Sequence, residues 1–269
     1  MKWYIDQGIF SQHETEQAVA VCIDDDMPEL FVPTGVTEID HSAFSGCRNL
    51  QRIVLPEGVV SIGAFAFSDC QRLTDVVLPS TVREIGKCAF YRCTALEQLT
   101  LPAALACISD SMLDSCYALR SVTVPEELRE IGFMAFCSCE RLESIDIPAS
   151  LEQLGQFAFS GCRSLRAAYL PDSLTAVPAA AFAGCTGLES VRLPDSVTEI
   201  GHSAFSNCVS LTHIDLPEGL TAICQAAFWG CSKLVPPPLP ESVTEVGYQA
   251  FARCAQTDDD VILYTPLPE

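Results

Sequence analysis

The sequence predicts an α/β-type repeat solenoid, a right-handed curved coil with a parallel β-sheet on its concave face and short strands, turns or 3₁₀/helical turns on its convex side. Three residue types recur every 23 residues and predict this fold. Proline stands at Pro33, Pro56, Pro79, Pro102, Pro125, Pro148, Pro171, Pro194, Pro217 and Pro240. Cysteine stands at Cys47, Cys70, Cys93, Cys116, Cys139, Cys162, Cys185, Cys208, Cys231 and Cys254. Phenylalanine stands at Phe44, Phe67, Phe90, Phe136, Phe159, Phe182, Phe205, Phe228 and Phe251, with Leu113 as the one substitute.

The end of each unit predicts a strand. In the unit Pro56–Leu78, the residues Leu73, Val76 and Leu78 are spaced so that the last part alternates between a buried and an exposed side. Pro79 follows directly. Proline lacks the N–H that a β-ladder needs, so we expect it to end the strand where the chain turns a corner.

The middle of the unit predicts a second inward-facing stretch and then a compact turn. Val59 and Ile62 mark the inward-facing stretch, and glycine at the phase of Gly63 is expected to relieve the next corner. Ala66 and Phe67 are expected to begin a helical or 3₁₀ turn, with the aromatic ring filling the interior. One such coil cannot bury its own apolar side chains, so the coils must stack on their neighbours.

The two ends depart from the repeat, which predicts three regions. Residues 1–32 are expected to form an N-terminal cap, in which 18–23 pairs with a leading strand over 27–32 across an acidic turn. Residues 33–254 hold the ten repeats, and residues 255–269 form a C-terminal cap and tail.

The bulk composition excludes several classes of partner. The chain is 49% hydrophobic and carries a formal net charge of −20, so it is expected to fold and to repel the phosphate backbone of a nucleic acid. No apolar run is long enough to span a bilayer. The N-terminus has an acidic residue where a secretion signal would have its apolar segment, which favours a cytoplasmic location, and a secreted or cell-surface location is the alternative.

Fifteen cysteines raise the question of metals and disulfides. A series with one cysteine per coil spreads its thiols along the stack, whereas a zinc site needs its ligands to converge, so we expect no metal and no cofactor. The in-phase cysteines are expected to be free, buried thiols. Cys22, Cys88, Cys107, Cys137 and Cys224 lie outside that series.

Two groups of polar residues are candidate chemical sites. His213 and Asp215 stand two positions apart on one strand face, which is a possible acid–base pair, but an open face without a pocket favours a polar surface patch. Glutamate recurs in one phase, which suggests a calcium-binding stripe, but no calcium-loop motif accompanies it and a solvated outer face is favoured. These glutamates are Glu38, Glu84, Glu130, Glu199 and Glu245. The sequence therefore predicts no catalytic residue and no enzyme.

The variable positions of the expected sheet are the candidate binding residues. Phe31, Val54 and Val77 form an apolar stripe on three adjacent strands, beside Arg52 and Asp75. High β-propensity alone explains such residues, and a patch that anchors a protein partner is the functional alternative. The other candidates on this face are Gln98, Thr100, Tyr169, Arg192, His213 and Asp215.

The unit L-P-x-x-V-T-E-I-G-x-x-A-F-x-x-C-x-x-L, nearly complete from Leu193 to Leu211, resembles the BspA-type leucine-rich repeats, also called the Treponema pallidum class. The resemblance covers roughly residues 27 to 263. It implies a leucine-rich-repeat solenoid of the kind found mostly in bacterial surface proteins, which binds other proteins and often mediates adhesion.

Together these observations predict a monomeric, non-catalytic protein-binding module that uses its concave sheet for recognition. An adhesin that contacts a host and a cytoplasmic scaffold or regulatory domain are both open alternatives. An enzyme with a site that no motif reveals is the third.

Overall fold

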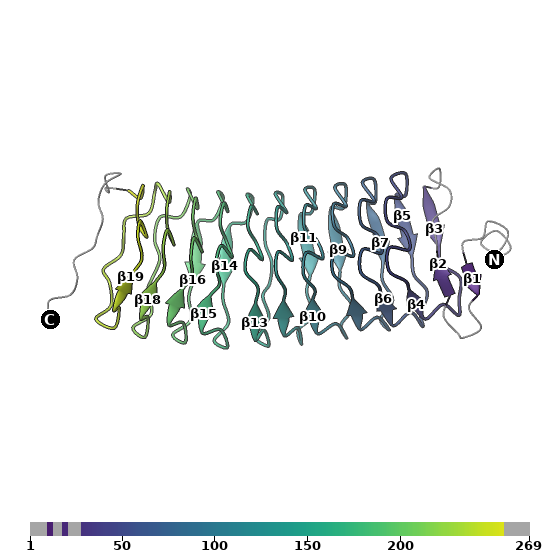
Figure 1. The fold of residues 1–269 in the computed structure, drawn as a ribbon, viewed down its shortest axis with the longest axis horizontal. Helices are drawn as coiled ribbons and strands as arrows, with labels where there is room; N and C mark the ends of the chain where they lie inside the picture. The colour runs from purple at the N-terminus through teal and green to yellow at the C-terminus, as the bar shows by residue number, and fades with distance from the viewer. Residues whose placement is uncertain (1–9, 13–17, 21–27, 256–269) are drawn as a thin grey trace.

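The computed structural model describes residues 10–12, 18–20 and 28–255. These residues form an elongated solenoid in which each 23-residue coil contributes up to two short strands, and the coils lie side by side along one axis (Figure 1). Apart from an N-terminal hairpin, all described strand pairs are parallel and join residues that are 23 positions apart.

The strands that precede the repeat prolines form a row, and we call the surface of this row the first strand face. Each coil is counted from this strand onward. The strands of this row are β3 (Glu29–Phe31), β5 (Arg52–Val54), β7 (Asp75–Val77), β9 (Gln98–Thr100), β11 (Ser121–Thr123), β14 (Ala167–Tyr169) and β16 (Ser190–Arg192). The central residue of each strand points into the core, and its two neighbours point outward. The alternation expected from the sequence is therefore confirmed for these strands.

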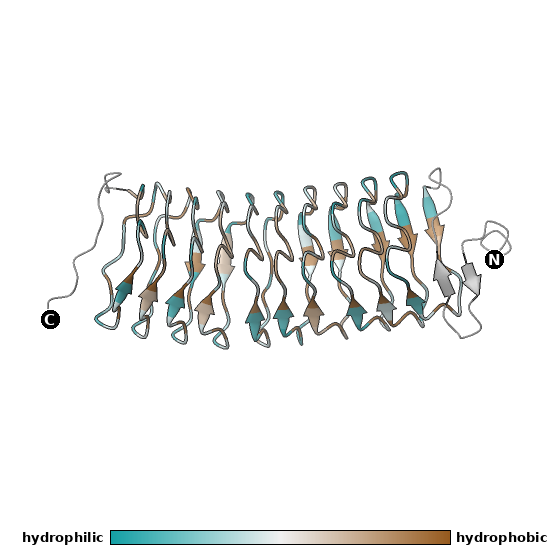
Figure 2. Ribbon diagram, in the orientation of Figure 1, coloured by the Kyte–Doolittle hydropathy of each residue, from teal (hydrophilic) through white to brown (hydrophobic). Residues whose placement is uncertain are grey.

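The second row of strands lies after the proline corner. Its strands are β4 (Glu38–Ile39), β6 (Ser61–Ile62), β8 (Glu84–Ile85), β10 (Cys107–Ile108), β12 (Glu130–Ile131), β13 (Gln153–Leu154), β15 (Ala176–Val177), β17 (Glu199–Ile200), β18 (Ala222–Ile223) and β19 (Glu245–Val246). In each of them the second residue packs inward. This row and the turns that follow it complete the coil around a continuous apolar core (Figure 2).

The N-terminal pairing differs from the expected one. Strand β2 (Ala18–Ala20) pairs antiparallel with β1 (Phe10–Gln12), and β3 pairs parallel with β5. The leading strand β3 thus extends the first row of strands by one, because its residues have the same spacing as those of the repeat strands. Strand β2 pairs with β1 and not with this leading strand. The remaining parts of the proposed caps, 1–9, 13–17, 21–27 and 256–269, lie outside the described residues.

The first row lacks a strand in several coils. No strand forms at 236–238, because Pro236, Pro237 and Pro238 have no N–H to donate. The expected strands over 144–146 and 213–215 are also absent, and both segments end in aspartate, a residue disfavoured in strands, at Asp146 and Asp215.

The second row is interrupted at two positions, and the hydrogen bonds explain both. In most coils, the residue after the strand donates its N–H to the preceding coil, as Gly86 does to the carbonyl of Ile62 at 2.8 Å. At the equivalent position Pro178 has no N–H, and Ser109 bonds the carbonyl of Ile85 through its hydroxyl instead. The row divides between β8 and β10 and between β13 and β15, directly at these residues.

Glycine after the second strand is required for a different reason from the one the sequence suggested. The glycines here do not have a positive φ; instead they lie against the backbone of the preceding coil. A Cβ on Gly86 would lie 2.5 Å from the amide nitrogen of Ala64. Close stacking of coils, rather than corner geometry, therefore selects glycine.

The third side of each coil consists of turns. No α-helix or 3₁₀ helix occurs in the described residues, so the expected helical turn is not found. Two residues per coil adopt a left-handed conformation, as Phe65 and Asp69 do with φ of 58° each. Successive backbone amides then donate to different coils. The N–H of Ala66 donates to the carbonyl of Gly63 in its own coil, whereas the N–H of Phe67 donates to the carbonyl of Ala89 in the next coil. A helix would direct all of these amides along its own axis.

The phenylalanine series forms a stacked column in the core. Neighbouring rings lie 5.1 to 5.5 Å apart between centroids and are nearly parallel, from Phe44 to Phe90 and from Phe136 to Phe251. Leu113 divides the column. The expectation that the aromatic ring fills the interior is confirmed.

The cysteine series forms a second column with a specific bond. Each thiol donates a hydrogen bond to a backbone carbonyl of the preceding coil, that of the residue in the phenylalanine position. Cys162 Sγ, for example, donates to Phe136 O at 3.2 Å. The same contact recurs from Cys70 to Cys254 at 3.0 to 3.2 Å. The eight thiols of this series from Cys70 to Cys231 are free, as expected. Cys47 is disulfide-bonded, so the expectation is wrong for that coil, and its partner lies outside the described residues.

Replacing Gly86 by alanine should lower the free energy of unfolding by about 1–3 kcal/mol, because the added Cβ forces two coils apart. The matched control is Gly219→Ala, where the Cβ would meet its nearest atom, Asp195 O, at an ordinary 3.5 Å. Urea denaturation of both variants measures the difference. Equal stability of the two variants would contradict close stacking as the reason for glycine.

The column thiols should resist alkylation while the protein is folded. Burial raises the pKa of Cys116 to about 12 and that of the partly exposed Cys107 and Cys224 to about 11, so all three are neutral at pH 8. Iodoacetamide should label Cys107 and Cys224 slowly at pH 8 and faster toward pH 10, as the thiolate fraction rises, and should leave Cys116 unlabelled. Mass spectrometry of the native protein measures this, and labelling of Cys116 at the rate of Cys224 would refute it.

Candidate functional site

The first strand face brings the predicted apolar stripe together at its N-terminal end. The strand register places Phe31 beside Val54, and Val54 beside Val77. Phe31 is 51% exposed and Val77 is 40% exposed, whereas Val54 is half-buried between them. The three side chains form one apolar surface across β3, β5 and β7, which we call the N-terminal patch.

Charged groups border this patch and are held in place. Arg52 Nε lies 2.8 Å from Asp75 Oδ2, and the Arg52 guanidinium carbon lies 5.9 Å from the centroid of the Phe31 ring. A cation above an aromatic face is attracted by the ring quadrupole. The patch and its charged border are therefore preorganised on three paired strands.

The other predicted residues lie farther along the same face. Gln98 and Thr100 project from β9, and Tyr169, which is 62% exposed, lies beside Arg192 in the register of β14 and β16. The structure thus separates the predicted residues into an N-terminal group and a group at β14–β16. It does not join them into one contact surface.

His213 and Asp215 contact each other outside any strand. The imidazole Nε2 lies 2.8 Å from Asp215 Oδ1, and both side chains are largely exposed. Neither residue lines the groove described below. Their geometry is that of an open surface pair rather than of a pair enclosed in a water-excluding site.

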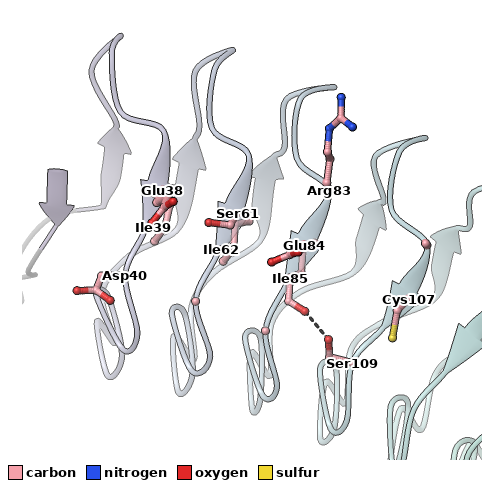
Figure 3. Close-up of a pocket in the computed structure, with 13 residues that line it drawn as sticks. Glu38, Ile39, Asp40, Ser61, Ile62, Arg83, Glu84, Ile85, Cys107 and Ser109 are labelled. Atoms are coloured by element: carbon pink, nitrogen blue, oxygen red, sulfur yellow. Dashed lines mark hydrogen bonds between the residues drawn. The ribbon is translucent and has the colours of Figure 1, made fainter. Parts of the chain in front are cut away.

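A groove that sequence reasoning missed lies on the second row of strands. It has a volume of about 700 Å³ and crosses four coils, with Glu38, Glu84 and Cys107 among the residues that line it (Figure 3). Gly63 and Gly86 contribute no side chain to its floor. The repeated glycine was visible in the sequence, but its effect on the surface depends on how the coils stack.

The described residues contain no group of three histidine, cysteine or acidic side chains that could hold a metal ion. In the same part of the chain, no helix has the length and apolar character needed to cross a bilayer.

Comparison with known proteins agrees with this geometry. A family model for the BspA type leucine rich repeat region matches residues 23–143 and 129–258, with six copies. No curated protein sequence matches the chain.

Several solved bacterial structures share the fold. A leucine-rich cell surface protein of Faecalibacterium prausnitzii is 23% identical, with a TM-score of 0.54, over 89% of this chain and 92% of that one. A T. pallidum leucine-rich repeat protein is 24% identical, with a TM-score of 0.53, over 76% and 88%. A Eubacterium ventriosum leucine-rich repeat protein is 20% identical, with a TM-score of 0.55, over 90% and 87%. At these identities the similarity establishes the fold, and together with the family match over most of its length it shows that this chain belongs to the BspA-type leucine-rich repeat family.

Proposed function

We propose that this chain is a non-catalytic, monomeric protein-binding module that recognises a protein partner through its first strand face. The observation that carries the proposal is the N-terminal patch of Phe31, Val54 and Val77, bordered by the Arg52–Asp75 ion pair. Exposed apolar side chains provide surface that a partner can bury. Charged groups held beside them can fix the partner's orientation.

Tyr169 and Arg192 form a second contact region in this proposal. Tyrosine and arginine contribute binding energy at interfaces more often than most residues, and these two lie side by side on paired strands. The polar residues on β9 and the His213–Asp215 pair extend the same face as adaptable contacts.

The location of the module is a separate part of the proposal. The similar F. prausnitzii protein is named a cell surface protein, which favours the secreted or cell-surface alternative over the cytoplasmic one. An adhesin that contacts a host is consistent with such a location.

The patch is tested by the double variant Val54→Asp and Val77→Asp. Val77 is 40% exposed and Val54 is half-buried, so neither substitution buries a carboxylate fully and any fall in the melting temperature should equal that of the control below. Partners are first captured on the immobilised chain and identified, and each is then purified. The affinity of the double variant for a purified partner should be at least about tenfold lower than that of the unaltered chain, because the interface would have to bury two carboxylates.

The matched control is Ser121→Asp with Thr123→Asp, which places two carboxylates on β11 of the same face but outside the patch. The affinity of this control variant for the purified partner should change by less than about twofold. Equal loss in both double variants, or full binding by the patch variant, would reject the N-terminal patch as the recognition site.

A further inference from the structure

The charges of this protein are unevenly distributed around the coil. All seven ion pairs that involve lysine or arginine in the described residues join partners 23 positions apart, so each links equivalent positions of adjacent coils. Examples are Arg120 with Glu143 and Arg166 with Glu189. Most cations of the first strand face are thus neutralised by a neighbouring coil.

The acidic surplus lies on one side. We define the second strand side as the segment equivalent to 57–63 in every coil, and the turn side as the segment equivalent to 68–72. The second strand side carries fourteen acidic residues and two arginines, Arg83 and Arg129. The described turn side carries seven basic residues and three acidic ones. The second strand side contains the Arg129–Glu152 ion pair but keeps a large acidic surplus, so the field of the protein is strongly negative there.

The groove of about 700 Å³ lies on this acidic side (Figure 3). Its lining residues come from four successive coils, so the groove runs along the solenoid axis and across the strands. Gly63 and Gly86 are among its lining residues and contribute no side chains, while Glu38, Asp40 and Glu84 supply three carboxylates and Arg83 supplies one cation. A ligand that lies in it therefore meets a net negative lining.

The spacing of the glutamates gives the ligand a length scale. Glu38, Glu84 and Glu130 occupy every second coil, and the intervening position holds the small residues Ser61 and Cys107. With strands about 4.8 Å apart, glutamates two coils apart are separated by about 10 Å. A polyproline-II segment completes one turn in three residues and about 9.3 Å, so a basic residue at every third position would match this spacing.

We propose that the second strand side binds an extended polypeptide segment that carries a lysine or arginine at about every third residue. The segment lies along the groove, its cations pair with Glu84 and its equivalent Glu38, and its backbone packs beside Gly63 and Gly86. This interface uses different residues from the N-terminal patch, so the two binding sites stand or fall independently.

The test uses the full chain and a defined probe, the fluorescently labelled peptide (Pro-Pro-Lys)₄, with binding measured by fluorescence anisotropy at low salt. The double variant Glu38→Gln with Glu84→Gln removes the two groove glutamates that lie two coils apart, without changing side-chain size. It should weaken binding by about tenfold, as expected for the loss of two close charge pairs at the protein surface. The affinity of the unaltered chain should fall as salt is raised.

The matched control is Glu97→Gln with Asp146→Asn, which changes the net charge equally but on the first strand face. It should change the affinity less than about twofold. Thermal unfolding of both double variants verifies that each is folded.

Three outcomes would overturn the proposal. The first is absence of binding to the unaltered chain, and the second is equal weakening in both double variants, which would reduce the interaction to net charge. The third is that free spermidine binds as tightly as the peptide and with the same dependence on Glu38 and Glu84, which would identify a small polycation rather than a polypeptide as the ligand.

Discussion

The contact between adjacent coils is the constraint on which the whole structure depends. A single coil has no closed core, and many of its backbone amides have no partner within it. Both deficits are resolved by the next coil: the phenylalanine rings stack at 5.1 to 5.5 Å, and amides such as that of Phe67 bond to Ala89 in the following coil. Stability is therefore a property of neighbouring pairs, as in other repeat proteins.

The same constraint explains which positions cannot vary. Cysteine fits its phase because a small thiol both fills the core and donates to a carbonyl of the preceding coil, as Cys139 does to Leu113 at 3.2 Å. Glycine is favoured after the second strand because a Cβ at Gly86 and most of its equivalents would contact the backbone of the preceding coil too closely. Where the residue at this phase lacks the backbone hydrogen bond to the preceding coil, at Ser109 and Pro178, the strand row is interrupted, whereas Cys224 keeps that bond and the row continues.

Positions that face solvent are free of this constraint, so binding residues are expected there. On the first strand face, ion pairs between coils hold most of the cations, and an apolar patch lies at one end. The second strand side is acidic and grooved. One periodic scaffold thereby offers two surfaces with different chemistry, and each favours a different kind of contact.

The sequence alone determined the coil length, the buried phases and the strand alternation, because the 23-residue period and the apolar spacing allow only a stacked coil. It also placed Phe31, Val54 and Val77 on adjacent strands. Only the tertiary structure decided that the third side forms turns rather than helices, that the strand rows are interrupted and that glycines leave a groove beside Glu84. Each of these depends on hydrogen bonds and distances between coils, which no single repeat contains.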